Sequence, residues 1–228
     1  MKSLPFPVWT LGVCAIAGLV FLVPQLQPAL VYNREAIGSG ELWRLFTGNL
    51  VHFSPGHLLK DVVALLVAGA IVEMRRYRHF ALLCIVSATL IGATLYAAEA
   101  GVLIYGGLSG VAIAAVAYLG LQGAAEGGAY ARVCQVLLLG LAAKIIIELS
   151  SGLQASDGFV LVPISHVVGA FTAAAVFALS RLRRIVPMRL RGGAACGGGS
   201  SSLDSARERL RRHSRRWHSA PAFPSSAS

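Results

Sequence analysis

Charged residues are scarce in this chain of 228 residues, because Asp, Glu, Lys and Arg together make up only 13% of it. Hydrophobic residues make up 56%, and the mean hydropathy is +0.68. This composition excludes an ordinary soluble domain, in which charged residues account for about a quarter of the chain. The four cysteines lack the spacing of zinc ligands, so we expect no metal site from them. We also expect no cofactor.

The chain contains several long apolar segments with few charged residues. A helix needs about 20 apolar residues to cross a bilayer core of about 30 Å. No small-residue cleavage site follows the first segment, so we expect no cleavable signal peptide. The polar stretch 25–55 is too long for a tight turn and should form a structured outer loop after the first helix. We predict an all-α membrane protein, a bundle of six transmembrane helices at 8–23, 57–72, 80–98, 108–121, 133–149 and 163–179.

The basic residues are concentrated at the C-terminal end. From Arg181 onward the chain holds 11 of its 20 Lys and Arg residues but only 2 of its 10 Asp and Glu residues. We therefore predict a membrane domain, 1–185, and a basic, Gly/Ser-rich, disordered cytoplasmic tail, 186–228. The tail could lie on anionic lipid. Nucleic-acid binding is not expected, because no nucleic-acid-binding fold accompanies the charge.

Positive charges in the short loops predict the orientation of the bundle. With six spans, Lys2 and the arginines after the second, fourth and sixth spans all fall on one side of the membrane. Only Arg34 and Arg44 fall on the other side. We therefore expect an integral membrane protein with both termini in the cytoplasm.

This topology brings three polar groups to a similar depth near the outer face. The second, fourth and sixth segments run in the same direction, and they begin with His57 and Asp61, with Ser109 and with His166, respectively. Ionisable groups are costly in a membrane and normally face the interior of a bundle. The matched positions therefore favour one shared site.

Ser109 and His166 form the candidate catalytic pair. A serine hydroxyl becomes a good nucleophile when a neighbouring base takes its proton, and histidine suits that role. Gly110 and Gly169 would allow the two helices to approach closely. The plainer alternatives are that Ser109 is a small packing residue and that His166 bonds a carbonyl group.

Acyl transfer also needs donors for an oxyanion. The backbone N–H of Ser109 at a helix start is one candidate, and His57 is another. His57 and Asp61 stand four residues apart, so they share one helix face. The alternative for this pair is a buried hydrogen bond that only joins helices.

The motifs around these residues resemble those of rhomboid intramembrane serine proteases, in family order. The resemblance implies a six-helix bundle that hydrolyses peptide bonds in or beside the transmembrane helix of a substrate, without metal or nucleotide. It implies Ser109 as nucleophile, His166 as general base and His57 as oxyanion stabiliser, with no third acid. His52, Trp43 and Arg44 would be structural or gating residues. The matching stretches are Trp43–Thr47, His52–Ser54, His57–Leu59, Gly107–Val111 and His166–Gly169.

Two positions depart from the family pattern. Asp61 stands where bacterial rhomboids usually have Asn, and it could donate a hydrogen bond only if protonated, or else orient His57. Ile113 stands where rhomboids often have a Tyr that stacks on the histidine, so His166 must be held in another way. The compact form and the acid are most like the rhombosortase branch. That branch is thought to process proteins that end in Gly-Gly, a transmembrane helix and a basic tail.

Other functions stay open. One is an inactive rhomboid-like protein that binds membrane clients. Another is a small transporter, in which Lys144 and Glu148 would carry function, although a mutual salt bridge is the preferred interpretation of that pair. A soluble Gly-x-Ser-x-Gly hydrolase is excluded, because Ser109 lacks the second spaced glycine and the alternating strands and helices.

Overall fold

The computed structural model describes the backbone of residues 6–151 and 162–193. The chain divides into two compact units, 1–181 and 182–228, and the fold below is that of the first. It is mainly helical, with a single pair of short strands among the described residues. Residues 194–228, which hold most of the predicted basic tail, lie outside the described part.

Six long helices correspond to the six predicted segments. In the described residues these are α1 (Val8–Leu22), α5 (Pro55–Met74), α6 (Phe80–Ala98), α7 (Ser109–Ala124), α8 (Gly128–Ser151) and α9 (Pro163–Gly193). Three of them, α6, α8 and α9 as far as Leu182, are long and apolar enough to cross a membrane, and a bent pair made by α1 and residues 24–30 could be a fourth. The count of six spans therefore stays a prediction.

Helix α7 is the centre of the bundle. It packs against α5, α6 and α8, and most of its residues are buried. Small residues permit this: a Cβ at Gly120 would come 2.7 Å from a methyl carbon of Leu138 on α8. Close approach of this kind is how membrane helices associate without a hydrophobic driving force. The serine at the start of α7 therefore belongs to a helix that three other helices contact.

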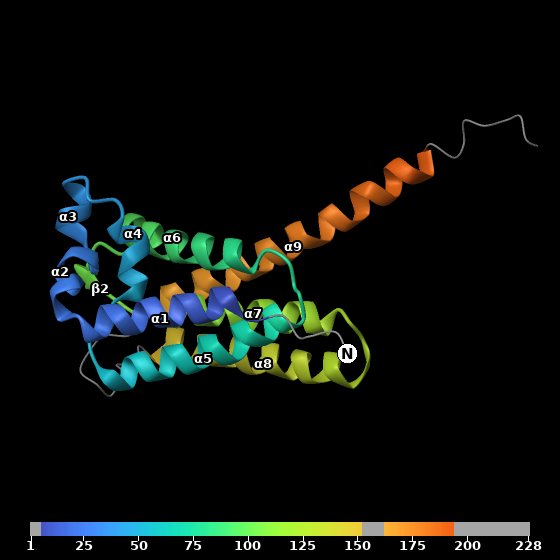
Figure 1. Cartoon of the computed structure of the whole chain (residues 1–228), viewed down its shortest axis with the longest axis horizontal. Helices are drawn as coiled ribbons and strands as arrows, with labels where there is room; N and C mark the ends of the chain where they lie inside the picture. The colour runs from blue at the N-terminus through green and yellow to red at the C-terminus, as the bar shows by residue number, and fades with distance from the viewer. Residues whose placement is uncertain (1–5, 152–161, 194–228) are drawn as a thin grey trace, which may run out of the picture. The chain divides into compact units, whose positions relative to one another are not determined.

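The segment between α1 and α5 is a structured loop, as predicted. It contains η1 (Pro24–Leu26), α2 (Gln27–Leu30), β1 (Tyr32–Asn33), α3 (Arg34–Gly38), α4 (Arg44–Thr47) and η2 (Gly48–Leu50). Figure 1 shows α2, α3, α4 and strand β2 (Ile104–Tyr105) together at one end of the bundle. Strands β1 and β2 are antiparallel, with Tyr32 opposite Tyr105. This pairing fixes the chain a few residues before α7.

Arg44 holds the loop together. Its side chain is buried, donates to the carbonyl oxygens of Pro28 (2.7 Å) and Val31 (2.9 Å), and forms an ion pair with Glu41. Trp43 is exposed, and its indole N–H donates to the carbonyl oxygen of Ala29 at 3.1 Å. Both side chains therefore hydrogen-bond the backbone of the loop, and whether either one has a gating role stays a prediction.

Glu73 joins two helices at the opposite end of the bundle. Its carboxylate accepts hydrogen bonds from the backbone N–H groups of Trp9 (3.1 Å) and Thr10 (2.7 Å) and from the Thr10 hydroxyl (2.6 Å). The first N–H groups of a helix lack intrahelical acceptors. Glu73, near the end of α5, therefore caps the start of α1 and fixes one helix to the other.

Candidate active site

Ser109 is the first residue of α7 and is half-buried. The backbone turns tightly between β2 and α7 at Gly107, which has φ +136° and lies against α5. A Cβ at this glycine would come 2.6 Å from His57 Nε2 and 3.3 Å from Asp61 Oδ2. The backbone just before the serine therefore packs closely against His57 and Asp61 of α5.

Three buried polar side chains form a cluster beside this passage. His52 Nε2 and His57 Nε2 each lie 3.2 Å from the same oxygen, Oδ2 of Asp61. His52 Nδ1 lies 3.2 Å from the Leu50 carbonyl oxygen, and the N–H of Leu108 donates to His52 Nε2 at 3.3 Å. At least one proton must be shared within the cluster, because a carboxylate oxygen would be repelled by two unprotonated imidazole nitrogens.

The ligand atoms of His52, His57 and Asp61 all lie within 4.8 Å of one another. Two imidazoles and one carboxylate are a donor set that first-row divalent metals accept. Among the described residues this is the group that could hold a metal ion. The same cluster also bonds Leu108 and packs against Gly107, so it equally suits a role in holding the backbone that leads into α7. Our prediction remains a reaction without metal.

Helix α9 meets α7 at two glycines. A Cβ at Gly169 would overlap the carbonyl oxygen of Gly110, and a Cβ at Gly110 would come 2.9 Å from the carbonyl oxygen of Ser165. Ser109 precedes Gly110, and His166 follows Ser165. The two candidate catalytic residues therefore flank one close helix crossing, and His166 is only 2% exposed.

Tyr105 lies at the same crossing. Burial raises the pKa of Tyr105 to about 12, while the nearby hydroxyls of Ser165 and Ser109 lower it in part. The phenol therefore stays neutral at physiological pH, and it donates a long hydrogen bond of 3.4 Å to the Gly107 carbonyl oxygen. Sequence reasoning did not identify Tyr105 as a neighbour of Ser109, although it lies only four residues away.

Glu148 contacts His166, and this contact was not predicted from the sequence. It forms the predicted salt bridge with Lys144, but its other oxygen, Oε2, lies 2.7 Å from His166 Nδ1. The family resemblance implies no third acid, whereas the structure gives His166 an acidic partner. A hint was present in the sequence, because Glu148 ends an apolar segment at the depth predicted for the start of α9.

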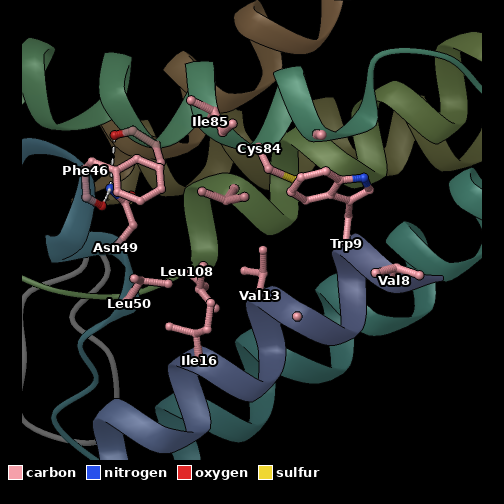
Figure 2. Close-up of a pocket in the computed structure, with 14 residues that line it drawn as sticks. Val8, Trp9, Val13, Ile16, Phe46, Asn49, Leu50, Cys84, Ile85 and Leu108 are labelled. Carbon is pink, nitrogen blue, oxygen red and sulfur yellow. Dashed lines mark hydrogen bonds between the residues drawn. The ribbon is translucent and has the colours of Figure 1, made fainter.

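Two cavities adjoin this region. One of about 270 Å³ lies between Phe53, the chain from Gly101 to Gly106, and Val162 just before α9. It is bordered by the backbone that leads to Ser109. The other, of about 400 Å³, is almost entirely apolar and lies between α1, α6 and Leu108 (Figure 2). Among the described residues, those that line the second cavity carry no charge, so this cavity suits hydrocarbon rather than hydrolysis.

A match to a known protein family covers most of the described helices. The family model of the Rhomboid domain matches residues 39–183, which is more than half of the chain. The chain belongs to the rhomboid family. Rhomboids are generally serine proteases that act on membrane proteins within the bilayer. Together with its apolar helices, this makes the chain an integral membrane protein. No curated protein matches the sequence.

Proposed function

We propose that this rhomboid is an active intramembrane serine endopeptidase, with Ser109 as nucleophile and His166 as general base. The observation that carries the proposal is the crossing of α7 and α9 at Gly110 and Gly169. At this crossing a half-buried serine begins one helix, and a buried histidine lies in the first turn of the other. An inactive client-binding protein would not need the two groups at one crossing.

In the proposed reaction, Ser109 Oγ attacks the carbonyl carbon of the scissile peptide bond. Its proton passes to His166, which then gives a proton to the departing amine as the C–N bond breaks. Water hydrolyses the acyl ester in a second step, with the same histidine as base. No metal or nucleotide takes part in these steps.

The oxyanion of the tetrahedral intermediate would be stabilised by the backbone N–H of Ser109 and by His57. The N–H groups in the first turn of a helix have no intrahelical acceptor and are available for an anion. The neighbouring N–H of Leu108 already donates to His52 and is not available. His57 lies against Gly107, two residues before the serine, and in this proposal its Nε2–H turns from Asp61 toward the oxyanion when the intermediate forms.

Asp61 would hold the His57 ring in position through their 3.2 Å contact. His52 shares the same carboxylate oxygen and holds the cluster to the Leu108 backbone. In this proposal Asp61 and His52 are positioning residues, since neither needs to touch the substrate. The cluster replaces the His and Asn pair that is usual in bacterial rhomboids.

The substrates would be proteins with a single transmembrane span, cut near the outer face of a bacterial inner membrane. The rhombosortase branch would narrow these to proteins that end in Gly-Gly, a membrane span and a basic tail. The cavity beside residues 101–106 borders the backbone before Ser109 and offers space for an extended peptide. Both termini of the protease would face the cytoplasm.

Covalent labelling tests the proposed nucleophile. Purified protein in detergent is treated with a fluorophosphonate probe, and the modified residue is mapped by mass spectrometry. We expect the label on Ser109 in the wild type and none in Ser109→Ala or His166→Ala. Ser39→Ala, which changes an exposed serine of the outer loop, serves as the matched control and should be labelled normally. Equal labelling of Ser109→Ala and the wild type would refute the assignment.

A further inference from the structure

The contact between Glu148 and His166 joins two buried groups on different helices. Glu148 lies in the last turn of α8 and is 6% exposed, and His166 lies in the first turn of α9 and is 2% exposed. The distance of 2.7 Å between Oε2 and Nδ1 is that of a charge-assisted hydrogen bond. A buried carboxylate without a partner would be costly, so the pairing stabilises both groups.

Each oxygen of the Glu148 carboxylate has its own partner. Oε1 pairs with the ammonium of Lys144, which lies one helical turn earlier on α8. This local pair partly neutralises the acid and lowers the cost of burying it. Because the Lys144 pair forms within one helix, it does not require His166. The second oxygen, Oε2, is therefore available to accept a hydrogen bond from His166.

We infer that Glu148 is a positioning residue that completes a Ser109–His166–Glu148 triad, an inference that rests on the proposed function. A carboxylate at Nδ1 holds the proton on that nitrogen, which leaves Nε2 unprotonated and able to accept the proton of Ser109. During the reaction the Nδ1–H stays between His166 and Glu148. The carboxylate then stabilises the imidazolium that forms, and no proton is transferred to the acid itself.

The residue four positions after the serine supports this role. Ile113 is a buried residue of α7 and offers no hydrogen bond and no aromatic ring. Rhomboids often have a Tyr at this position that stacks on the histidine. In this chain another group must therefore orient His166. Among the described contacts of His166, the bond to Glu148 provides it. In this chain the hydrogen bond from His166 to the Glu148 carboxylate thus takes the place of aromatic stacking on the histidine.

The competing explanation is that Glu148 only forms a structural salt bridge with Lys144. Two variants separate the explanations. Glu148→Gln keeps the shape of the side chain but removes the charge seen by His166. Lys144→Met, the matched control, breaks the same salt bridge but leaves the Glu148–His166 contact. For all variants, elution and thermal unfolding in detergent establish that the protein is folded.

The measurement is the rate of fluorophosphonate labelling of Ser109 as a function of pH. We expect Glu148→Gln to lose roughly 10²- to 10⁴-fold in rate, as when the acid of a triad is removed. Its rate profile should also move to lower pH, because the imidazolium loses its anionic partner. Lys144→Met should lose less than about tenfold, with its profile moved to higher pH, since a repelling cation is gone.

The outcomes distinguish this inference from the proposed function. If the wild type is not labelled at Ser109, the proposed function fails and the triad fails with it. If the wild type is labelled but the two variants lose the same rate, with unmoved pH profiles, only the role of Glu148 is overturned. A purely structural salt bridge between Lys144 and Glu148 would give that second result, because it would not change the pH at which His166 titrates.

Discussion

Gly169 on α9 packs directly on the backbone of Gly110 on α7, with no room for a methyl group between them. The contact lies one residue after Ser109 and three residues after His166. It therefore sets the separation of the two candidate catalytic groups. Backbone carbonyl oxygens cannot rotate away as a flexible side chain can, so this separation is sensitive to a single added carbon.

Gly169→Ala should therefore push α9 away from α7. We expect a loss of about 1–3 kcal/mol in stability, as for overpacked cores, and a loss of roughly 10²-fold in activity from misplaced groups. Gly140→Ala on α8 is the control, because a Cβ there meets nothing within 4 Å. Thermal unfolding in detergent and the rate of substrate cleavage report the two effects. Normal activity in Gly169→Ala would contradict the importance of the crossing.

Gly107→Ala should disturb the approach to Ser109. The position has φ +136°, which costs a residue with a side chain about 1–3 kcal/mol. The new Cβ would also press on the His57 ring. We expect at least a tenfold loss in the rate of Ser109 labelling. Gly127→Ala, which also has a positive φ (+89°) but meets nothing within 4 Å, should label like the wild type. Equal rates for both variants would argue against a role for the Gly107–His57 contact.

Asp61→Asn should keep activity within about tenfold, because an amide NH2 group at the shared position has two N–H donors and can bond both histidines. Asp61→Ala should lose both activity and about 1–3 kcal/mol of stability, since two buried imidazoles then lose their partner. Cleavage rate and thermal unfolding distinguish the two variants. Complete inactivation of a folded Asp61→Asn protein would instead show a role that needs the acid itself.

Glu73→Ala should destabilise the bundle without changing the chemistry. Three donors from Trp9 and Thr10 lose their acceptor, at a cost of about 1–3 kcal/mol. Glu73→Gln keeps an acceptor oxygen and should retain much of the stability. The midpoint of thermal unfolding measures the difference, and the labelling rate of Ser109 below that midpoint should be unchanged. A change in the labelling rate alone would place Glu73 nearer to the site than the fold indicates.

The helices were the most predictable part of the fold. The predicted segment 80–98 coincides with α6, because its apolar run ends sharply at both sides. Helix α5 begins two residues before its predicted start, at Pro55, where the Ser54 side chain caps it. Helix α9 continues to Gly193, well past its predicted end at 179. Hydropathy detects where apolar residues end, and a helix can continue through arginines.

Individual residues of the candidate site were predictable from the sequence, but most of the contacts between them were not. The spacing of His57 and Asp61 indicates one helix face, and the structure places both side chains together. That His52 shares the same carboxylate oxygen depends on the folded loop, which has no periodic signal. The bond from Glu148 to His166 depends on how α8 and α9 are rotated toward each other, and spacing along one helix does not contain that information.

The most direct test of the proposed protease is cleavage of a tagged protein with one transmembrane span and a Gly-Gly motif before it. Wild type, Ser109→Ala and His166→Ala would be compared in membranes at matched expression, with Ser39→Ala as the control. We predict that the wild type and Ser39→Ala cleave the substrate and that the other two do not. Sequencing the new terminus then tests the rhombosortase branch. Equal cleavage by the wild type, Ser109→Ala and His166→Ala would contradict the account.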